Sequence, residues 1–163
     1  MDFKRYIQFT RELQHAGFLS VPVIYKSLDG LSIEEAIENF VPHERRSIDY
    51  KHIDNQSLLE VRPIDNGVHL SYVHGGKELG VGNGTKAMQT LIKLCDKHGY
   101  DIELQTYSRD SIIDEAKGLF EFYRKLGFCI HQIDGWEDVV TEADLVDSDH
   151  LEGVPMKRSP NIA

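Results

Sequence analysis

The chain has 163 residues, of which 40% are hydrophobic and 28% charged, values that are ordinary for a folded domain with a real core. Its 27 acidic and 18 basic side chains give a formal net charge of −9, which argues against a nucleic-acid-binding surface because no basic stripe is available to contact phosphates. No apolar run approaches the roughly 18 residues of a membrane span, and the two cysteines lack the spacing of a zinc site or a disulfide framework. We therefore expect one reduced, cytoplasmic domain over residues 1–163, with no metal and no membrane contact.

The first 44 residues form a helical part that differs in pattern from the rest. Apolar residues recur at helical spacing from Phe3 to Leu13, and Gly17 predicts the end of this helix. Residues 20–27 predict an edge strand, since a proline interrupts them. A capping box, Ser32 to Glu35, predicts the start of a second helix.

The pattern changes to strands near Arg45. Residues 45–53, 57–64 and 67–74 predict three strands, separated by the hairpin signals DNQ and DNG. The central part of the chain is therefore expected to be an antiparallel meander.

Helices and strands alternate after the meander. The expected elements are a helix over 85–98 closed by Gly99, a strand over 101–108, a helix over 111–126, and strands over 128–134 and 153–158. A right-handed crossover makes 101–108 parallel to 67–74. The predicted fold class is α+β, a mixed and mostly antiparallel sheet with one central parallel pair and helices on both faces.

The stretch ELGVGNGTKAMQ (residues 78–89) places three glycines at alternate positions in front of a helix, a pattern typical of phosphate binding. A Walker A loop is excluded, because Thr85 precedes Lys86 and no Lys-Ser/Thr pair follows the glycines. A dinucleotide fingerprint has different glycine spacing, and its acidic residue ends a strand, whereas Asp101 and Glu103 begin one.

Two motifs and their order carry a resemblance to a known family. The first is Leu79–Gly84 followed by Thr85, and the second is GLFEFYRKLGF (residues 118–128). In the order strand, glycine loop, helix, parallel strand and helix, residues 45–158 resemble the GNAT superfamily of acetyl-CoA-dependent N-acetyltransferases. The resemblance implies that acetyl-CoA is the acyl donor, that a primary amine is the acceptor, and that homodimers are to be considered.

The resemblance also assigns a binding role to the loop and to one strand. The residues expected to hold the pyrophosphate are Leu79, Gly80, Val81, Gly82, Asn83, Gly84 and Thr85, and the backbone N–H of Val73 is expected near the thioester carbonyl. Glycines let successive amides turn inward, and the positive end of the helix points to the same place. The Thr85 hydroxyl is expected either to cap the helix or to donate to a phosphate oxygen.

Acetyl transfer needs a base for the amine and a proton for the departing sulfur. By resemblance Tyr123 supplies that proton, although a core aromatic would fit the same apolar helical stripe. For the base we predict His69, which strand alternation places on the same face as Val73, with Glu60 and Glu103 as alternatives.

Two departures from the family pattern bear on catalysis. Leu79 replaces the usual arginine or glutamine, and Ala116 replaces an asparagine that often bonds pantetheine, so that Ser108, Arg109 or backbone groups would take its place. The alternative is a catalytically inactive GNAT-fold protein that acts as a binding module.

An acidic segment follows the last predicted helix. Residues 136–153 hold seven carboxylates and no lysine or arginine, and begin with Trp136, which either stacks on a substrate or anchors the segment. They predict a cationic acceptor, either a small molecule or a protein lysine or N-terminus, or else form only a solvated loop.

Overall fold

The computed structural model describes residues 2–21, 48–76, 78, 80–106, 113–131 and 153–162. The predicted capping-box helix and almost all of the acidic segment lie outside the described residues, as do the side chains of residues 113–117.

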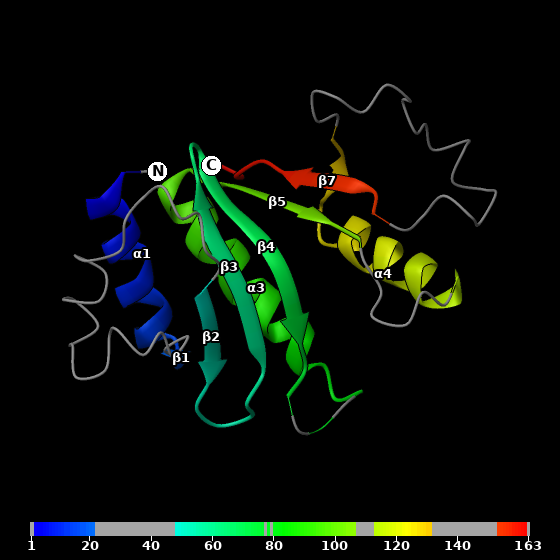
Figure 1. Cartoon of the computed structure of the whole chain (residues 1–163), viewed down its shortest axis with the longest axis horizontal. Coiled ribbons are helices and arrows are strands. Elements are labelled where there is room, and N and C mark those ends of the chain that lie inside the picture. The colour runs from blue at the N-terminus through cyan, green and yellow to red at the C-terminus, as the bar shows by residue number, and fades with distance from the viewer. Residues whose placement is uncertain are drawn as a thin grey trace, which may run out of the picture.

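Seven described strands form one sheet in the order β1-β2-β3-β4-β5-β7-β6 (Figure 1). They are β1 (Phe18–Val21), β2 (Ile48–His52), β3 (Leu58–Ile64), β4 (Gly67–His74), β5 (Asp101–Gln105), β6 (Cys129–Ile130) and β7 (Pro155–Arg158). Among these strands β4 and β5 form the one parallel pair, and every other neighbour is antiparallel. The predicted mixed sheet with a central parallel pair is confirmed.

Three helices are described, and two end where the glycines predicted. They are α1 (Phe3–His15), α3 (Asn83–His98) and α4 (Ile113–Lys125). The chain leaves α1 through Gly17 at φ 91° and α3 through Gly99 at φ 70°, backbone angles that glycine adopts without strain. The Asp2 side chain accepts a hydrogen bond from the Arg5 amide at 2.9 Å and caps α1.

Two predicted strands are shorter than expected within the described residues. β5 ends at Gln105, and the next residue, Thr106, still accepts a hydrogen bond from the Val154 amide through its side chain at 3.1 Å. β6 ends at Ile130, one residue before His131, whose amide donates to the Pro155 carbonyl at 2.9 Å.

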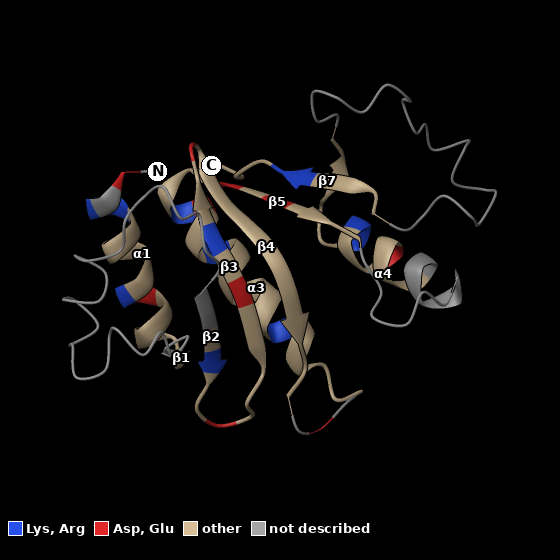
Figure 2. Cartoon of the chain, viewed as in Figure 1, with Lys and Arg blue, Asp and Glu red and all other residues tan. Residues whose placement is uncertain are grey.

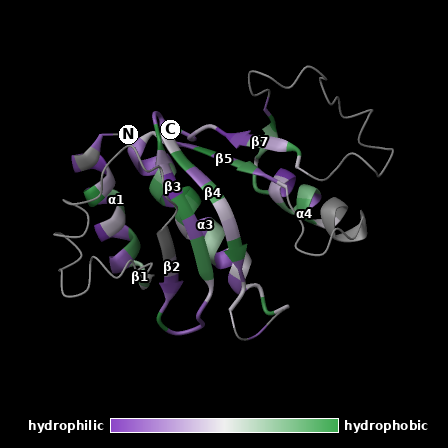
Figure 3. Ribbon diagram, viewed as in Figure 1, coloured by the Kyte–Doolittle hydropathy of each residue, from purple (hydrophilic) through white to green (hydrophobic). Residues whose placement is uncertain are grey.

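The hydrophobic core lies between α1, α3 and one face of the sheet. Figure 1 shows α3 behind β3 and β4, and Figure 3 shows hydrophobic residues recurring along these strands and α3. The buried side chains on this face and on the two helices include Tyr6, Phe9, Leu13, Leu59, Val61, Val68, Leu70, Ala87, Met88, Leu91, Ile102, Leu104 and Met156. We call this the core face, and the opposite face, which carries Glu60, Arg62 and His69, the polar face.

An ion pair ties α3 to the last strand. Two Arg158 nitrogens donate to the two Asp96 carboxylate oxygens at 2.6 and 2.9 Å, and the Asn161 amide donates to the same carboxylate at 2.8 Å. Such a two-point contact fixes both angle and distance, so it positions β7 and the following segment against α3.

Candidate functional site

The parallel pair separates part-way along its length. β4 and β5 pair from Gly67 with Asp101 to Leu70 with Leu104. Beyond this point β4 continues with β3 as far as His74, while β5 continues with β7. The two strands therefore diverge after Leu70 and Leu104, as the diverging arrows in Figure 1 show.

A β-bulge in β4 lies at the point of separation. Glu60 pairs with Tyr72, whereas the next residue of β3, Val61, pairs with Leu70, so Ser71 is an extra residue. A bulge of this kind bends the strand and shifts the side chains that follow it to the other face. It puts Val73 on the core face and Tyr72 on the polar face.

The glycine loop leads from the diverging end of β4 into α3. Gly80 and Gly82 have φ values of 80° and 81°, and a Cβ at either position would meet nothing within 4 Å. The left-handed backbone, rather than lack of space, therefore explains why glycine suits these positions. The Val81 side chain between them is exposed within the described part of the chain. The outer side of the loop is therefore accessible to a ligand.

α3 begins two residues earlier than predicted. Gly82 is its N-cap in the left-handed conformation, no side chain caps the helix, and the Lys86 amide donates to the Gly82 carbonyl at 3.0 Å. Thr85 is thus inside the first turn, and its predicted capping role is wrong. Its contact with a phosphate oxygen stays a prediction. The first turn contains no acidic residue, which leaves the positive end of the helix available to an anion.

Close backbone contacts hold both ends of the loop. A Cβ on Gly76 would overlap the backbone of the β2–β3 turn at Asn55 and Gln56, so this turn supports the end of β4. A Cβ on Gly75 would lie 3.6 Å from the Gly84 amide nitrogen, which places the start of the loop beside the first turn of α3. The loop is therefore anchored on the sheet and on the helix.

Val73 and His69 do not share a face, contrary to the prediction. Val73 packs against the core, whereas His69 pairs with Arg62 on one side and Glu103 on the other, on the polar face. Strand alternation predicted one face, and the extra residue Ser71 reverses it. An acceptor on the His69 side would therefore approach the separated strands from the polar face.

His69 is held in its neutral form. Burial, with a smaller contribution from the Arg62 charge, lowers its pKa from 6.5 to about 4. Its Nδ1 atom is buried and has no hydrogen-bond partner among the described residues. The imidazole is therefore unprotonated at neutral pH, but it is a weak base.

Tyr123 lies in α4 and is buried with 5% of its surface exposed. Its ring contacts Phe122 at 5.2 Å and Phe128 at 5.5 Å between centroids, both edge-on. Burial raises the pKa of the Tyr123 hydroxyl above its usual value. The phenol consequently stays protonated, as a proton donor must, and it also serves the core.

The two alternative carboxylates differ in their surroundings. Glu103 lies 3.5 Å from the Lys157 ammonium and 3.9 Å from His131 Nε2. Glu60 is half-buried on the polar face of β3, and no ion pair or side-chain hydrogen bond of Glu60 is found among the described residues. The structure thus brings His69, Glu103 and Glu60 to the same face of the sheet.

Several predicted residues fall outside the described part of the chain. They are Leu79, Ser108, Arg109 and Trp136, together with the side chain of Ala116, which lies in α4. Within the described ranges, no group of three or more histidine, cysteine or carboxylate side chains is arranged to hold a metal ion. No described helix is both long and apolar enough to span a membrane.

Solved acetyltransferases resemble the chain in fold. Tetrahymena Gcn5 has a TM-score of 0.47 and 14% identity, over 98% of this chain and 91% of its own. The PaiA N-acetyltransferase of Thermoplasma acidophilum, in complex with coenzyme A, has a TM-score of 0.45 and 16% identity, over 97% and 92%. Arabidopsis thaliana Naa50, in complex with a bisubstrate analogue, has a TM-score of 0.45 and 15% identity, over 88% and 99%.

These likenesses are of the fold alone, at identities of 14–16% and TM-scores below 0.5. No family model and no curated protein matches its sequence. At these levels of similarity, the activity has to be argued from the chain's own residues.

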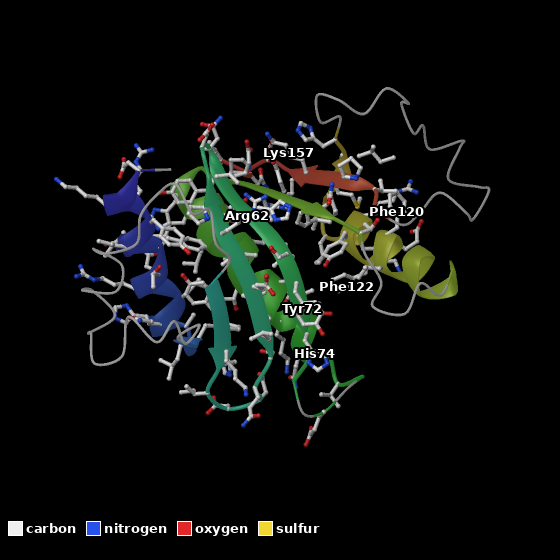
Figure 4. All side chains as sticks on the ribbon, in the orientation of Figure 1. Arg62, Tyr72, His74, Phe120, Phe122 and Lys157 are labelled. Atoms are coloured by element: carbon white, nitrogen blue, oxygen red, sulfur yellow. The ribbon has the colours of Figure 1, made fainter. Side chains whose placement is uncertain are left out.

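Sequence reasoning missed two aromatic side chains on β4. Tyr72 and His74 lie on the polar face beyond the bulge, and their rings stack at 6.0 Å between centroids. Figure 4 shows them at the end of β4 that has left β5. No sequence signal marks the bulge at Ser71, and without it these rings would have been assigned to the core.

Proposed function

We propose that the chain is an acetyl-CoA-dependent N-acetyltransferase that moves the acetyl group to a primary amine by direct attack. One observation carries the proposal: β4 leaves its parallel partner after Leu70 and runs directly into a positive-φ glycine loop at the start of α3. A long ligand with a thioester at one end and phosphates at the other suits this arrangement.

The loop would hold the pyrophosphate. Gly80 and Gly82 permit the left-handed turns that aim backbone amides at one point, and the N-terminus of α3 adds its positive end. The residues proposed to contact CoA here are Leu79, Gly80, Val81, Gly82, Asn83, Gly84 and Thr85. Pantetheine would then lie along β4, with the thioester carbonyl near the backbone N–H of Val73.

The acceptor would approach from the polar face, where His69 lies. A neutral imidazole can accept a proton from the amine, directly or through water, although a pKa of about 4 makes His69 a weaker base than a typical catalytic histidine. Tyr123 would donate its hydroxyl proton to the departing sulfur, since burial keeps the phenol protonated.

The proposal also covers the kind of acceptor, the cellular location and the oligomeric state. We expect the acceptor to be cationic, either a small amine or a protein lysine or N-terminus, because the chain carries a net charge of −9. Both cysteines are free, which is consistent with a cytoplasmic location. Formation of a homodimer is part of the proposal.

Thermal unfolding with ligands tests the binding step. CoA and acetyl-CoA should raise the Tm, and pantetheine, which lacks the pyrophosphate, should raise it much less at the same concentration. No stabilisation at millimolar CoA would overturn the proposal, and equal effects of CoA and pantetheine would overturn the role of the loop.

A turnover assay distinguishes an active acetyltransferase from a catalytically inactive binding module. Release of free CoA thiol from acetyl-CoA should depend on the presence of an amine. The replacements Leu79 and Ala116 favour a catalytically inactive GNAT-fold binding module. CoA binding without amine-dependent thiol release across a broad amine panel would establish that alternative.

A further inference from the structure

The polar face carries a small surface that the proposed chemistry does not use. It consists of Leu58 and Glu60 on β3, and of Tyr72 and His74 on β4, and we call it the Glu60–Tyr72 surface. Leu58 pairs with His74 and Glu60 pairs with Tyr72, so the four residues form two adjacent cross-strand pairs. The surface lies on the part of β4 that has separated from β5 and that also carries Val73.

The two rings present one aromatic surface. Tyr72 and His74 stack with 6.0 Å between centroids and 17° between ring planes. The Gly76 amide donates to His74 Nδ1 at 3.0 Å, which fixes the imidazole and requires that this nitrogen carry no proton. His74 Nδ1 is therefore occupied as an acceptor, and the ring is held beside Tyr72.

Glu60 supplies a negative charge next to these rings. Directly opposite residues of an antiparallel pair have Cβ atoms about 4.5–5.5 Å apart, so the Glu60 and Tyr72 side chains leave the sheet next to each other on the same face. Two other carboxylates of this face, those of Asp101 and Glu103, lie 2.8 and 3.5 Å from the Lys157 ammonium. No such partner of Glu60 is found in the described part of the chain. Figure 2 shows acidic residues on β3 and at the start of β5.

A carboxylate beside a stacked aromatic pair suits an organic cation. Ammonium and guanidinium groups are attracted to the face of an aromatic ring, and a carboxylate adds a charge-assisted hydrogen bond. An anion would be repelled by Glu60, and an uncharged alkyl group would leave the Glu60 carboxylate without a partner while removing it from water.

We propose that the Glu60–Tyr72 surface binds a positive charge on the acceptor that is separate from the amine to be acetylated. The acceptor is then a diamine or a peptide with a second cationic group, held by Tyr72 and Glu60 while its other amine reaches the thioester near Val73. This role rests on the proposed acetyl transfer, whereas the binding of an organic cation to the surface does not.

Turnover with three matched acceptors tests the role. Diaminobutane, aminobutanol and aminobutyrate present the same reacting amine with a positive, a neutral or a negative far end. The expected kcat/KM for diaminobutane is about tenfold above that for aminobutanol, with aminobutyrate lowest. Glu60→Gln should remove most of this preference, and Asp54→Asn, an equal loss of charge at the exposed β2–β3 turn, should retain it.

Binding without catalysis tests the surface itself. Titration of diaminobutane should produce a saturable shift of the Tyr72 ring resonances in NMR spectra, weakened by salt and by Glu60→Gln. Tyr72→Phe keeps the aromatic face and should retain binding, whereas Tyr72→Leu should lose it. If Tyr72→Leu fails to fold, Tyr72→Phe and Glu60→Gln still decide the outcome.

The failures of the two proposals are distinguishable. CoA binding and amine turnover with no preference for a second charge, or with a preference that Glu60→Gln leaves intact, would overturn this inference and leave the acetyltransferase standing. Absence of CoA binding would overturn the acetyltransferase, and the NMR titration would then decide whether the cation site exists. A Tyr72 resonance that does not move with diaminobutane rules the site out.

Discussion

Gly67 and Asp101 form the first pair of the parallel ladder, and they touch backbone to backbone. A Cβ on Gly67 would overlap the carbonyl oxygen and the amide nitrogen of Asp101. The Asp101 amide also donates to the Asn66 carbonyl at 3.0 Å, so the hairpin between β3 and β4 fixes where β5 begins. The divergence of β4 and β5 after Leu70 depends on this fixed start.

Gly67→Ala should therefore destabilise the protein, because the overlap is with backbone that cannot rotate away. Overpacking of this kind costs about 1–3 kcal/mol. Chemical denaturation of the variant should show this loss in the free energy of unfolding. Gly84→Ala is the matched control for stability: its Cβ would make an ordinary contact at 3.7 Å inside a helix, so the stability should be unchanged or slightly higher. A Gly67→Ala variant as stable as the wild type would show that the pair can shift apart at no cost.

Gly82→Ala should weaken CoA binding. Alanine at φ 81° is strained by roughly 1–2 kcal/mol, and relief of that strain would turn the loop amides away from the start of α3. Calorimetric titration should show a Kd for CoA at least about tenfold higher. Gly118→Ala in α4 also has empty surroundings but a helical backbone, so it should leave the Kd unchanged. Equal affinities for Gly82→Ala and wild type would contradict the assignment of the loop.

His69→Gln should flatten the acid side of the stability profile. The fold lowers the His69 pKa from 6.5 to about 4, so the unfolded chain binds this proton more readily between these values. The wild type therefore loses stability as pH falls from about 6.5 to about 4, and above this window the histidine is neutral in both states. Free energies of unfolding measured across pH 4–8 should fall less steeply for His69→Gln. Parallel curves for the two proteins would mean that His69 is accessible to protons.

Asp96→Asn should lower stability most at neutral pH. The Arg158 guanidinium holds the pKa of the Asp96 carboxyl below its usual value. The stabilisation is therefore present above the ordinary aspartate pKa and is lost as pH falls through the lowered one. We expect a loss of about 1–3 kcal/mol at pH 7 that shrinks in acid, measured by chemical denaturation. Arg158→Lys should show an intermediate loss, since an ammonium cannot make both hydrogen bonds; a loss that is the same at every pH would contradict the ion pair.

Much of the fold could be predicted because short-range signals determine it. The hairpin signals fixed the β2–β3–β4 meander, and the glycines at 17 and 99 fixed two helix ends, since each acts through its own backbone angles. The parallel β4–β5 pair followed from the single crossover helix between them. The exact start of α3 could not be predicted, because Asn83 and Gly84 have low helix propensity. They are held in the helix by the hydrogen bond from the Lys86 amide to the Gly82 carbonyl.

The candidate site was less predictable, because it depends on one extra residue. Ser71 is the bulge, and nothing in HLSYVH distinguishes it from a regular strand position. The shift of register it causes separates Val73 from His69 and turns Tyr72 to the polar face, so it decides which side chains face an acceptor. The bulge lies where β4 stops pairing with β5, at Leu70 and Leu104. Such a relationship between distant strands leaves no local signal in the sequence.

Tyr123→Phe should separate the catalytic role of this residue from its packing role. The substitution keeps the ring in contact with Phe122 and Phe128, so stability and the Kd for CoA should change by less than about 1 kcal/mol. Loss of the proton for the departing sulfur should lower kcat by about 100-fold or more in a thiol-release assay. Tyr6→Phe is the matched control, because the Tyr6 hydroxyl lies in the core 3.0 Å from that of Tyr50 and its removal should cost stability but not turnover. Full activity in Tyr123→Phe would assign the tyrosine to the core alone and leave the sulfur to be protonated by water.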